Sequence, residues 1–187
     1  MYRIIDTQLK LSQFTSFTEF EDAALTQDKI NSLEAVLAVS LRANSIGQAF
    51  AVAYRCALQV LLPQLESQQW AAMCVSEPQG SLPKQLQTRV TPAGVVSGQK
   101  SFVTMAELAR QLVVIAQSTE HGLSQSERPI LKAVLLQQPS KGISLQAMSA
   151  MNLVPDISHG KITLDNAQGV ILPGDGHSDY SKRFRYL

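Results

Sequence analysis

The chain has 187 residues, of which 45% are hydrophobic and 17% are charged, and its formal net charge is +1. This composition is typical of a folded globular protein with one domain or two small ones, and it excludes an extended disordered chain. Because 16 basic residues face 15 acidic ones, the sequence has no basic excess for nucleic acid or for an anionic membrane surface. We therefore expect no nucleic-acid partner.

The cysteines and histidines give no sign of a metal centre. Cys56 and Cys74 both lie in apolar runs, so we interpret them as small buried side chains rather than reactive thiols. The three histidines are far apart, and no pair has the spacing of metal ligands.

The sequence also shows no membrane or secretion signal. The first ten residues lack the apolar core of a secretory signal. The longest apolar stretch, 49–62, is shorter than the roughly 20 residues that cross a bilayer. We expect a soluble, cytoplasmic protein without a membrane span.

The N-terminal part is predicted to be helical. A phenylalanine recurs at every third position over 14–20, which fits either a short amphipathic helix or an extended arm. Asp28 can cap a helix whose apolar residues recur at helical spacing as far as Leu41. A second helix is predicted over 48–62, ending before Pro63, which lacks an N–H donor. Both helices are apolar around much of their circumference, so we expect them to pack against other helices or another subunit.

After Trp70 the pattern changes to short strands. Apolar runs rich in Val, Ile, Phe and Thr alternate with Gly, Pro and Ser breaks. The predicted strands are 71–76, 87–91, 95–97, 100–104, 112–116, 130–137, 142–146 and 161–164. Many short strands separated by turns indicate a β-barrel or a sandwich. The polar segment 118–128 is predicted to be an exposed loop, and the tail from Pro173 is predicted to cross the surface.

Two segments of this β-rich part are candidates for a binding site. Residues 74–81 read Cys-Val-Ser-Glu-Pro-Gln-Gly-Ser, and residues 98–104 read Gly-Gln-Lys-Ser-Phe-Val-Thr. Either segment alone is typical of a hairpin turn. Such a turn can also direct backbone N–H groups and Ser hydroxyls at an anion or a carbonyl-rich ring. The occurrence of both, separated by a strand-like stretch and a turn, favours a ligand site.

The order of these two segments resembles the middle domain of the acyl-CoA dehydrogenase family. That family carries a Thr-Glu-Pro-x-x-Gly-Ser-Asp loop and, about twenty residues later, a Gly-x-Lys-x-aromatic-Ile-Thr-Asn strand. The resemblance spans roughly residues 30–180 and is strongest over 62–116. It implies an α+β fold, with a short helical N-terminal region followed by an acyl-CoA-dehydrogenase-like middle-domain β-barrel of about seven or eight strands.

The resemblance also sets the expected domain boundaries. We expect a helical region over 1–70, a β-barrel middle domain over 71–172 and a tail over 173–187. In the family a C-terminal helical bundle follows such a tail, and it supplies the catalytic glutamate. We expect that bundle to be absent from this chain.

In the family these two motifs hold FAD. The resemblance implies that Ser76 contacts the pyrimidine end of the flavin and that Gly80 and Ser81 reach the pyrophosphate. It implies that Phe102 covers the flavin and that Thr104 hydrogen-bonds its N5. Flavin chemistry needs such donors and an aromatic group that excludes water. The full set of implied FAD-binding residues is Cys74, Ser76, Gly80, Ser81, Phe102 and Thr104.

The sequence departs from the family pattern in several places. The loop is one residue shorter, Leu82 replaces the family's Asp, and Met105 replaces its Asn. A shortened loop displaces donors that face phosphate. In the family's reaction a carboxylate removes the α-proton of an acyl thioester while the β-hydrogen leaves as hydride to flavin N5. We assign no residue as that base, because the Glu-Pro setting of Glu77 indicates a structural role.

Three hypotheses follow. The first is an FAD-dependent oxidoreductase that acts on the CH–CH group of acyl-CoA or a similar acyl thioester. The second is a non-catalytic remnant that binds an acyl thioester or a protein partner without flavin, and the shortened loop favours it. The third is an unrelated barrel. Phe102 and Thr104 favour the first. An exposed helical face would drive formation of a homo-oligomer or recruit a partner chain.

Overall fold

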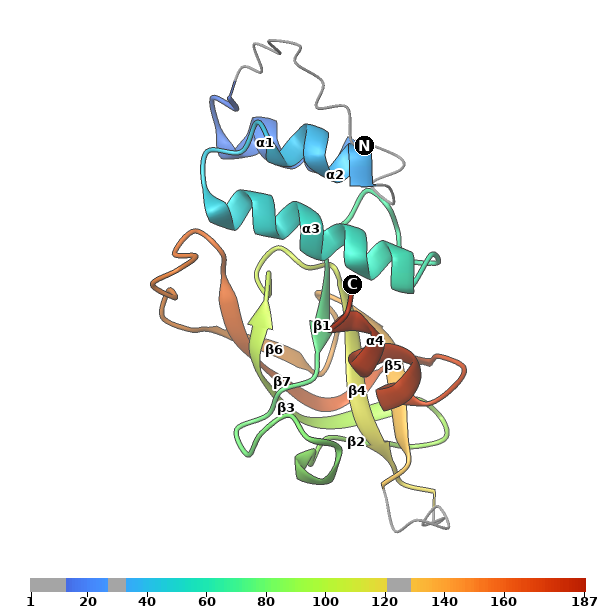
Figure 1. Ribbon diagram of the computed structural model, residues 1–187. Coiled ribbons are helices and arrows are strands. Elements are labelled where there is room, and N and C mark those ends of the chain that lie inside the picture. Colours follow the sequence, from blue (N-terminus) through green and yellow to red (C-terminus); the bar gives the residue numbers. More distant parts are fainter. Residues whose placement is uncertain (1–12, 27–32, 121–128) are drawn as a thin grey trace.

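Three helices precede an eight-stranded sheet in the computed structural model, which describes residues 13–26, 33–120 and 129–187 (Figure 1). The helices are α1 (Phe17–Thr26), α2 (Leu33–Ser40) and α3 (Ile46–Leu61). The strands are β1 (Ala71–Cys74), β2 (Arg89–Val90), β3 (Val95–Thr104), β4 (Gln111–Ser118), β5 (Leu131–Gln137), β6 (Ile143–Ala147), β7 (His159–Gln168) and β8 (Val170–Ile171). A 3₁₀ turn, η1 (Pro83–Gln85), precedes β2, and a π-helical turn, η2 (Gly176–Ser181), leads into α4 (Lys182–Phe184). The predicted α+β fold is confirmed.

The helices lie where the sequence pattern predicts them, but the first residues of α1 and α3 differ from the prediction. Of the phenylalanine-rich segment, the part from Phe17 onward is helical, and Phe14, which precedes the helix, packs its ring edge to face on Phe20 at 5.7 Å. α3 begins two residues earlier than predicted, because the Ser45 hydroxyl caps it by accepting the Gln48 N–H at 3.0 Å. The predicted cap at Asp28 lies outside the described residues, as does most of the predicted loop over 118–128.

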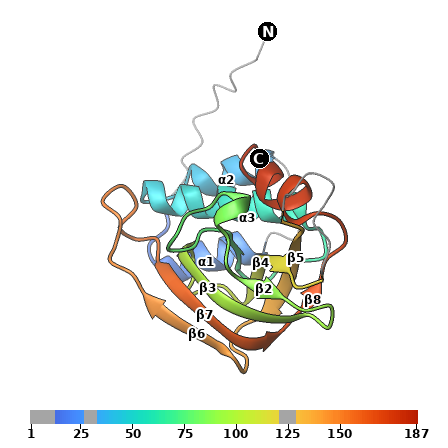
Figure 2. The same cartoon turned by 90° about the horizontal axis from the view of Figure 1, so that it is seen from below.

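The sheet is mixed and curls into a half-barrel, as Figure 2 shows. The strand order is β6-β7-β3-β2-β4-β5-β8, and β1 pairs with β4. β1 and β2 run parallel to β4, and the other paired strands are antiparallel. The strands predicted over 95–97 and 100–104 are a single strand, β3, which continues through Gly98 with irregular register against β7.

β4 separates two apolar clusters, because successive side chains of a strand point to opposite faces. Val113 and Ile115 pack in the cluster that the helices cover. Leu112, Val114 and Ala116 pack in the cluster inside the curl of the sheet. A strand that is buried on both faces reads as a continuous apolar run, which is the pattern of this segment.

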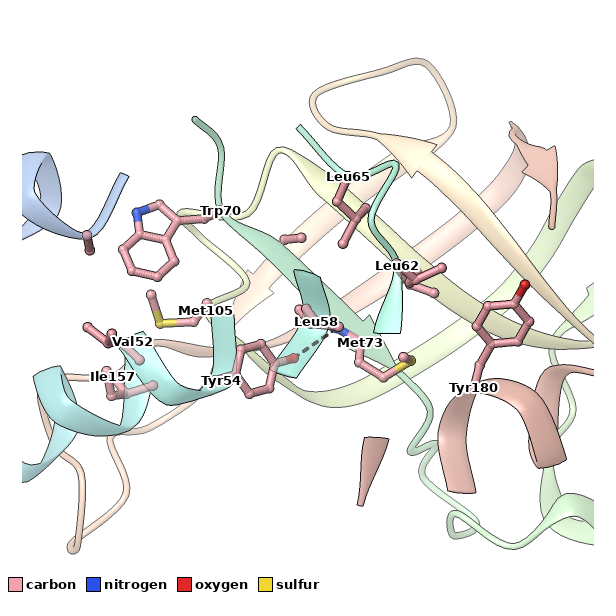
Figure 3. Packing of buried hydrophobic residues seen from close by; sticks show 14 of the residues in the cluster. Val52, Tyr54, Leu58, Leu62, Leu65, Trp70, Met73, Met105, Ile157 and Tyr180 are labelled. Carbon is pink, nitrogen blue, oxygen red and sulfur yellow. Dashed lines mark hydrogen bonds between the residues drawn. The ribbon is translucent and has the colours of Figure 1, made fainter. Parts of the chain in front are cut away.

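Tyr54 ties α3 to β1. Its hydroxyl oxygen accepts the backbone N–H of Met73 at 2.8 Å (Figure 3), and burial raises the pKa of Tyr54 above its usual value. We expect Tyr54→Phe to lower the free energy of unfolding by about 1–3 kcal/mol, because a buried N–H loses its partner. Urea denaturation measures this change. Tyr186→Phe, at an exposed position, is the matched control and should leave stability unaltered.

The C-terminal tail is helical rather than irregular. Asp175 caps η2, because its carboxylate accepts the N–H groups of His177 and Ser178 at 3.0 and 2.7 Å. The Phe184 ring then packs edge to face on Tyr54 at 5.2 Å. The tail thus packs against α3 through the ring of Phe184.

Candidate functional site

The structure brings the two sequence motifs side by side. The first motif follows β1, and the second forms most of β3. The backbone N–H of Ser101 donates to the carbonyl of Ser76 at 2.8 Å. The Lys100 ammonium donates to the carbonyl of Val75 at 3.2 Å. Residues that lie 25 positions apart in the sequence therefore form one local structure.

A buried ion pair holds the two motifs together. The Lys100 Nζ lies 2.6 Å from Glu77 Oε1, and the side chains are 0% and 1% exposed. The Glu77 carboxylate also accepts the backbone N–H groups of Gln87 at 2.5 Å and Thr88 at 3.1 Å. All of these donors stabilise the carboxylate anion.

The pKa values of this pair reflect the balance between burial and charge. Burial alone would raise the pKa of Glu77, but the hydrogen bond and charge of Lys100, with Gln87 and Thr88, hold it below its ordinary value. Burial lowers the pKa of Lys100, and Glu77 opposes that shift. Because its carboxylate is occupied by these partners, Glu77 has the structural role inferred from its Glu-Pro setting. The pairing itself was missed, although each motif contains one charged residue of opposite sign.

The short loop after Glu77 closes on itself. The Glu77 N–H donates to the Gly80 carbonyl at 2.9 Å, and the Gly80 N–H donates to the Glu77 carbonyl at 3.0 Å. Gly80 has a φ of +133°, in a region that glycine adopts without strain. One backbone donor that the resemblance assigns to phosphate is therefore used within the loop.

Phe102 is presented by a strained stretch of β3. It has a φ of +54°, and it lies where the register between β3 and β7 shifts. Its side chain is 58% exposed. A non-glycine residue with positive φ carries a conformational cost that is found preferentially at functional sites. The sequence contains no signal for this strain.

Three hydroxyls near these motifs are free. Ser76, Ser81 and Thr104 are half-buried. Within the described part of the chain, none of their side chains makes a hydrogen bond. Thr104 ends β3 and lies opposite His159 of β7. These hydroxyls are therefore available to a ligand.

Cys74 differs from the other implied residues. Its side chain is fully buried, and burial raises the pKa of its thiol to about 12 although the charge of Lys100 opposes the shift. The thiol contacts the Ala72 carbonyl at 3.7 Å. Cys74 can therefore offer a ligand only its backbone.

A cleft of about 580 Å³ begins next to Ser81, and the sequence did not predict it. Three segments line it: 82–85, 129–131 and the start of η2. Its apolar lining residues are Leu82, Pro83, Pro129, Ile130 and Leu131, and its polar ones are Lys84, Gln85, Asp175, His177 and Ser178. This volume and mixed lining are typical of small-molecule sites.

The described residues contain neither a membrane-spanning helix nor a metal-binding cluster. No helix among them is long and apolar enough to cross a membrane. No group of three or more His, Cys, Asp or Glu side chains in the described ranges could hold a metal ion.

No family model and no curated protein matches this sequence. Solved structures match with low identity. The FAD complex of PigA is 14% identical with a TM-score of 0.66, and the match covers 88% of this chain and 51% of that one. Butyryl-CoA dehydrogenase from Megasphaera elsdenii is 16% identical with a TM-score of 0.65, covering 88% and 52%. Glutaryl-CoA dehydrogenase from Mycobacterium smegmatis, solved with FADH2, is 17% identical with a TM-score of 0.61, covering 81% and 42%.

The present chain thus spans about half the length of the structures it matches. Those structures include acyl-CoA dehydrogenases, whose middle domain the two motifs resemble. The chain has the acyl-CoA dehydrogenase fold.

Proposed function

We propose that this chain is the FAD-binding part of an oxidoreductase of the acyl-CoA dehydrogenase type. One observation carries the proposal. The contacts of Lys100 and Ser101 with the first motif place both motifs together, with three free hydroxyls and an exposed aromatic ring. The proposed reaction acts on the CH–CH group of an acyl thioester.

The residues present suit a flavin at one end. Ser76 would donate at the pyrimidine carbonyls, Thr104 would donate at N5, and Phe102 would exclude water from the ring. When bound, FAD would supply the hydride acceptor. At the phosphate end fewer donors are available, because the Gly80 N–H already donates to the Glu77 carbonyl. Ser81 remains as the donor there.

The cleft beside Ser81 suits an acyl thioester carrier. Its apolar walls match an aliphatic chain, and Lys84 and His177 are suitable partners for phosphate. We assign no catalytic base, because the carboxylate of Glu77 is fully engaged by Lys100 and two backbone donors.

A second candidate function is binding of an acyl thioester or a protein partner without flavin chemistry. The self-closed loop at Gly80 favours this candidate, because it removes one donor from the phosphate end. The two candidates predict opposite results for flavin retention.

The visible absorption spectrum of the purified protein tests the proposal. The spectrum is recorded as isolated and after incubation with FAD and gel filtration. A retained flavin band supports the oxidoreductase. No retained flavin, even with excess FAD, contradicts it and favours the second candidate.

Thr104→Val tests the role of the hydroxyl. We expect the FAD dissociation constant to rise about three- to tenfold, because one hydrogen bond is worth roughly 1 kcal/mol. Titration followed by flavin fluorescence measures this, and photoreduction reports on N5. Thr163→Val, at an exposed position of β7, is the matched control. Unchanged affinity and unchanged reduction in Thr104→Val would remove Thr104 from the site.

A further inference from the structure

His159 lies beside Thr104, the residue proposed to donate at flavin N5. The two residues are opposite each other in the antiparallel pairing of β3 with β7. In the next pair, the Met105 N–H donates to the Ser158 carbonyl at 2.8 Å. Backbone hydrogen bonds alternate along such a ladder, so Thr104 and His159 form one of the closer pairs that have none. Their side chains therefore lie on the same face of the sheet, with Cβ atoms about 4.5–5.5 Å apart.

The imidazole of His159 has a fixed orientation. The residue begins β7, between β3 and β6 (Figure 2), and its carbonyl accepts the Met148 N–H at 2.8 Å. The residue is only 8% exposed, and its Nδ1 lies 3.0 Å from the Ile157 carbonyl oxygen. A carbonyl oxygen only accepts, so Nδ1 carries the ring hydrogen. In the neutral ring Nε2 is therefore an acceptor.

The Nε2 atom of His159 is available to a ligand. Within the described ranges it makes no hydrogen bond, and it is not one of the unpartnered side-chain atoms that are sealed from solvent. The ring borders a pocket of about 240 Å³, whose lining also includes Glu107 and residues 155–158. A buried ring whose acceptor has no partner in the fold can meet a donor on a bound ligand.

A flavin N5 needs a different partner in each oxidation state, because it accepts a hydrogen bond before reduction and carries a hydrogen afterwards. The Thr104 hydroxyl is a donor for the first state, and Nε2 of His159 is an acceptor for the second. Resting on the proposed function, we propose that His159 accepts the N5 hydrogen of reduced FAD. The hydride brings that hydrogen and both electrons to N5, so the imidazole accepts a hydrogen bond but gains no proton.

This role makes His159 a determinant of the reduction potential. A hydrogen bond that forms only with the reduced cofactor stabilises that state and raises the potential of bound FAD. Thr104 acts on the oxidised state and has the opposite effect. Loss of the Thr104 hydroxyl should therefore weaken mainly oxidised FAD, and loss of the His159 acceptor should weaken mainly reduced FAD.

Two amide substitutions test the acceptor. His159→Asn keeps an N–H near the position of Nδ1 but has no group at the position of Nε2, whereas the longer His159→Gln can accept there. We expect His159→Asn to weaken reduced FAD about three- to tenfold, the range of one hydrogen bond, and to change the oxidised-state dissociation constant less than about twofold. The potential should fall by about 15–30 mV, because tenfold corresponds to about 30 mV for a two-electron couple. His159→Gln should restore the wild-type potential.

The potential is measured on the FAD-loaded full chain by reduction against a reference dye. Fluorescence titration gives the dissociation constant of oxidised FAD, and circular dichroism verifies that each variant is folded. Thr163→Val, at an exposed position on the same face of β7, is the matched control and should keep the wild-type potential.

Two kinds of failure are distinguishable. Equal weakening of oxidised and reduced FAD in His159→Asn, or an unchanged potential, overturns the role of His159 while leaving the flavin site in place. So does a lowered potential that His159→Gln fails to restore. A wild-type chain that retains no FAD contradicts the proposed function itself, and this inference with it.

Discussion

Lys100→Met should lower the free energy of unfolding by about 3–5 kcal/mol, because it leaves the Glu77 carboxylate charged and buried without its counter-ion. The two side chains are almost completely inaccessible to solvent, so water cannot replace the lost partner. The substitution also removes the donor that Lys100 offers to the Val75 carbonyl. Urea denaturation of wild type and variant measures the loss.

Two further variants separate the ion pair from simple packing. Lys161→Met, at an exposed position of β7, is the control and should change stability by less than about 0.5 kcal/mol. The double variant Glu77→Gln/Lys100→Met should lose less than the sum of the single variants, because no uncompensated charge remains. Additive losses would show that the two charges are not coupled.

The same pair predicts a dependence on acid. In the folded protein the pKa of Glu77 lies below its ordinary value, because its bonds to Lys100, Gln87 and Thr88 outweigh the effect of burial. Its contribution is therefore complete above the unfolded pKa and is lost as pH falls through the folded one. Wild type should lose stability over this acidic range, and Glu77→Gln should lose less. Equal slopes in thermal denaturation across this range would contradict the coupling.

Gly98→Ala should destabilise the protein by about 2–4 kcal/mol, through backbone strain together with overpacking. Gly98 has a φ of +146°, and a Cβ there would lie 2.6 Å from the Cα of Thr88. The obstructing atom belongs to the backbone, so a change of rotamer cannot relieve the contact. Because Lys100 is two residues further along β3, the strain should also disturb its bond to Glu77.

Thermal and urea denaturation test this substitution. Gln99→Ala, at the next position and exposed, is the control and should remain close to wild type. If Gly98→Ala unfolds at the wild-type midpoint, then β3 and the segment around Thr88 can separate at little cost, and the close approach is not essential.

Local patterns in the sequence were enough to predict two of the helices and every strand except the two-residue β8, which was missed. β4 is a continuous apolar run, and apolar and polar residues alternate along β7. Each pattern lies within one short stretch of the chain, so it predicts a strand without a structure. The joining of two predicted strands into β3 could not be read, because glycine is also typical of turns. The helical tail was missed because its anchor, Phe184 on Tyr54, is a tertiary contact.

For the candidate site, the sequence likewise predicted which residues to examine but not how they are arranged. The motifs identified the positions of Phe102 and Thr104, but not the positive φ of Phe102 or the free hydroxyl of Thr104. The partnership of Glu77 with Lys100 depends on burial, which distant segments create together. The cleft beside Ser81 needs three segments from both ends of the β-rich part, so no single stretch of sequence contains it.

The pairing of β1 has a consequence for the order in which the molecule assembles. β1 leads directly into the first motif, and its Ala71–Cys74 ladder is completed by Gln111–Val114 of β4. A parallel ladder between distant segments forms only after the loop between them has closed, which slows folding. On a ribosome, both motifs would therefore emerge before the strand that organises them. The proposed flavin site should therefore form late in synthesis, when β4 has left the exit tunnel.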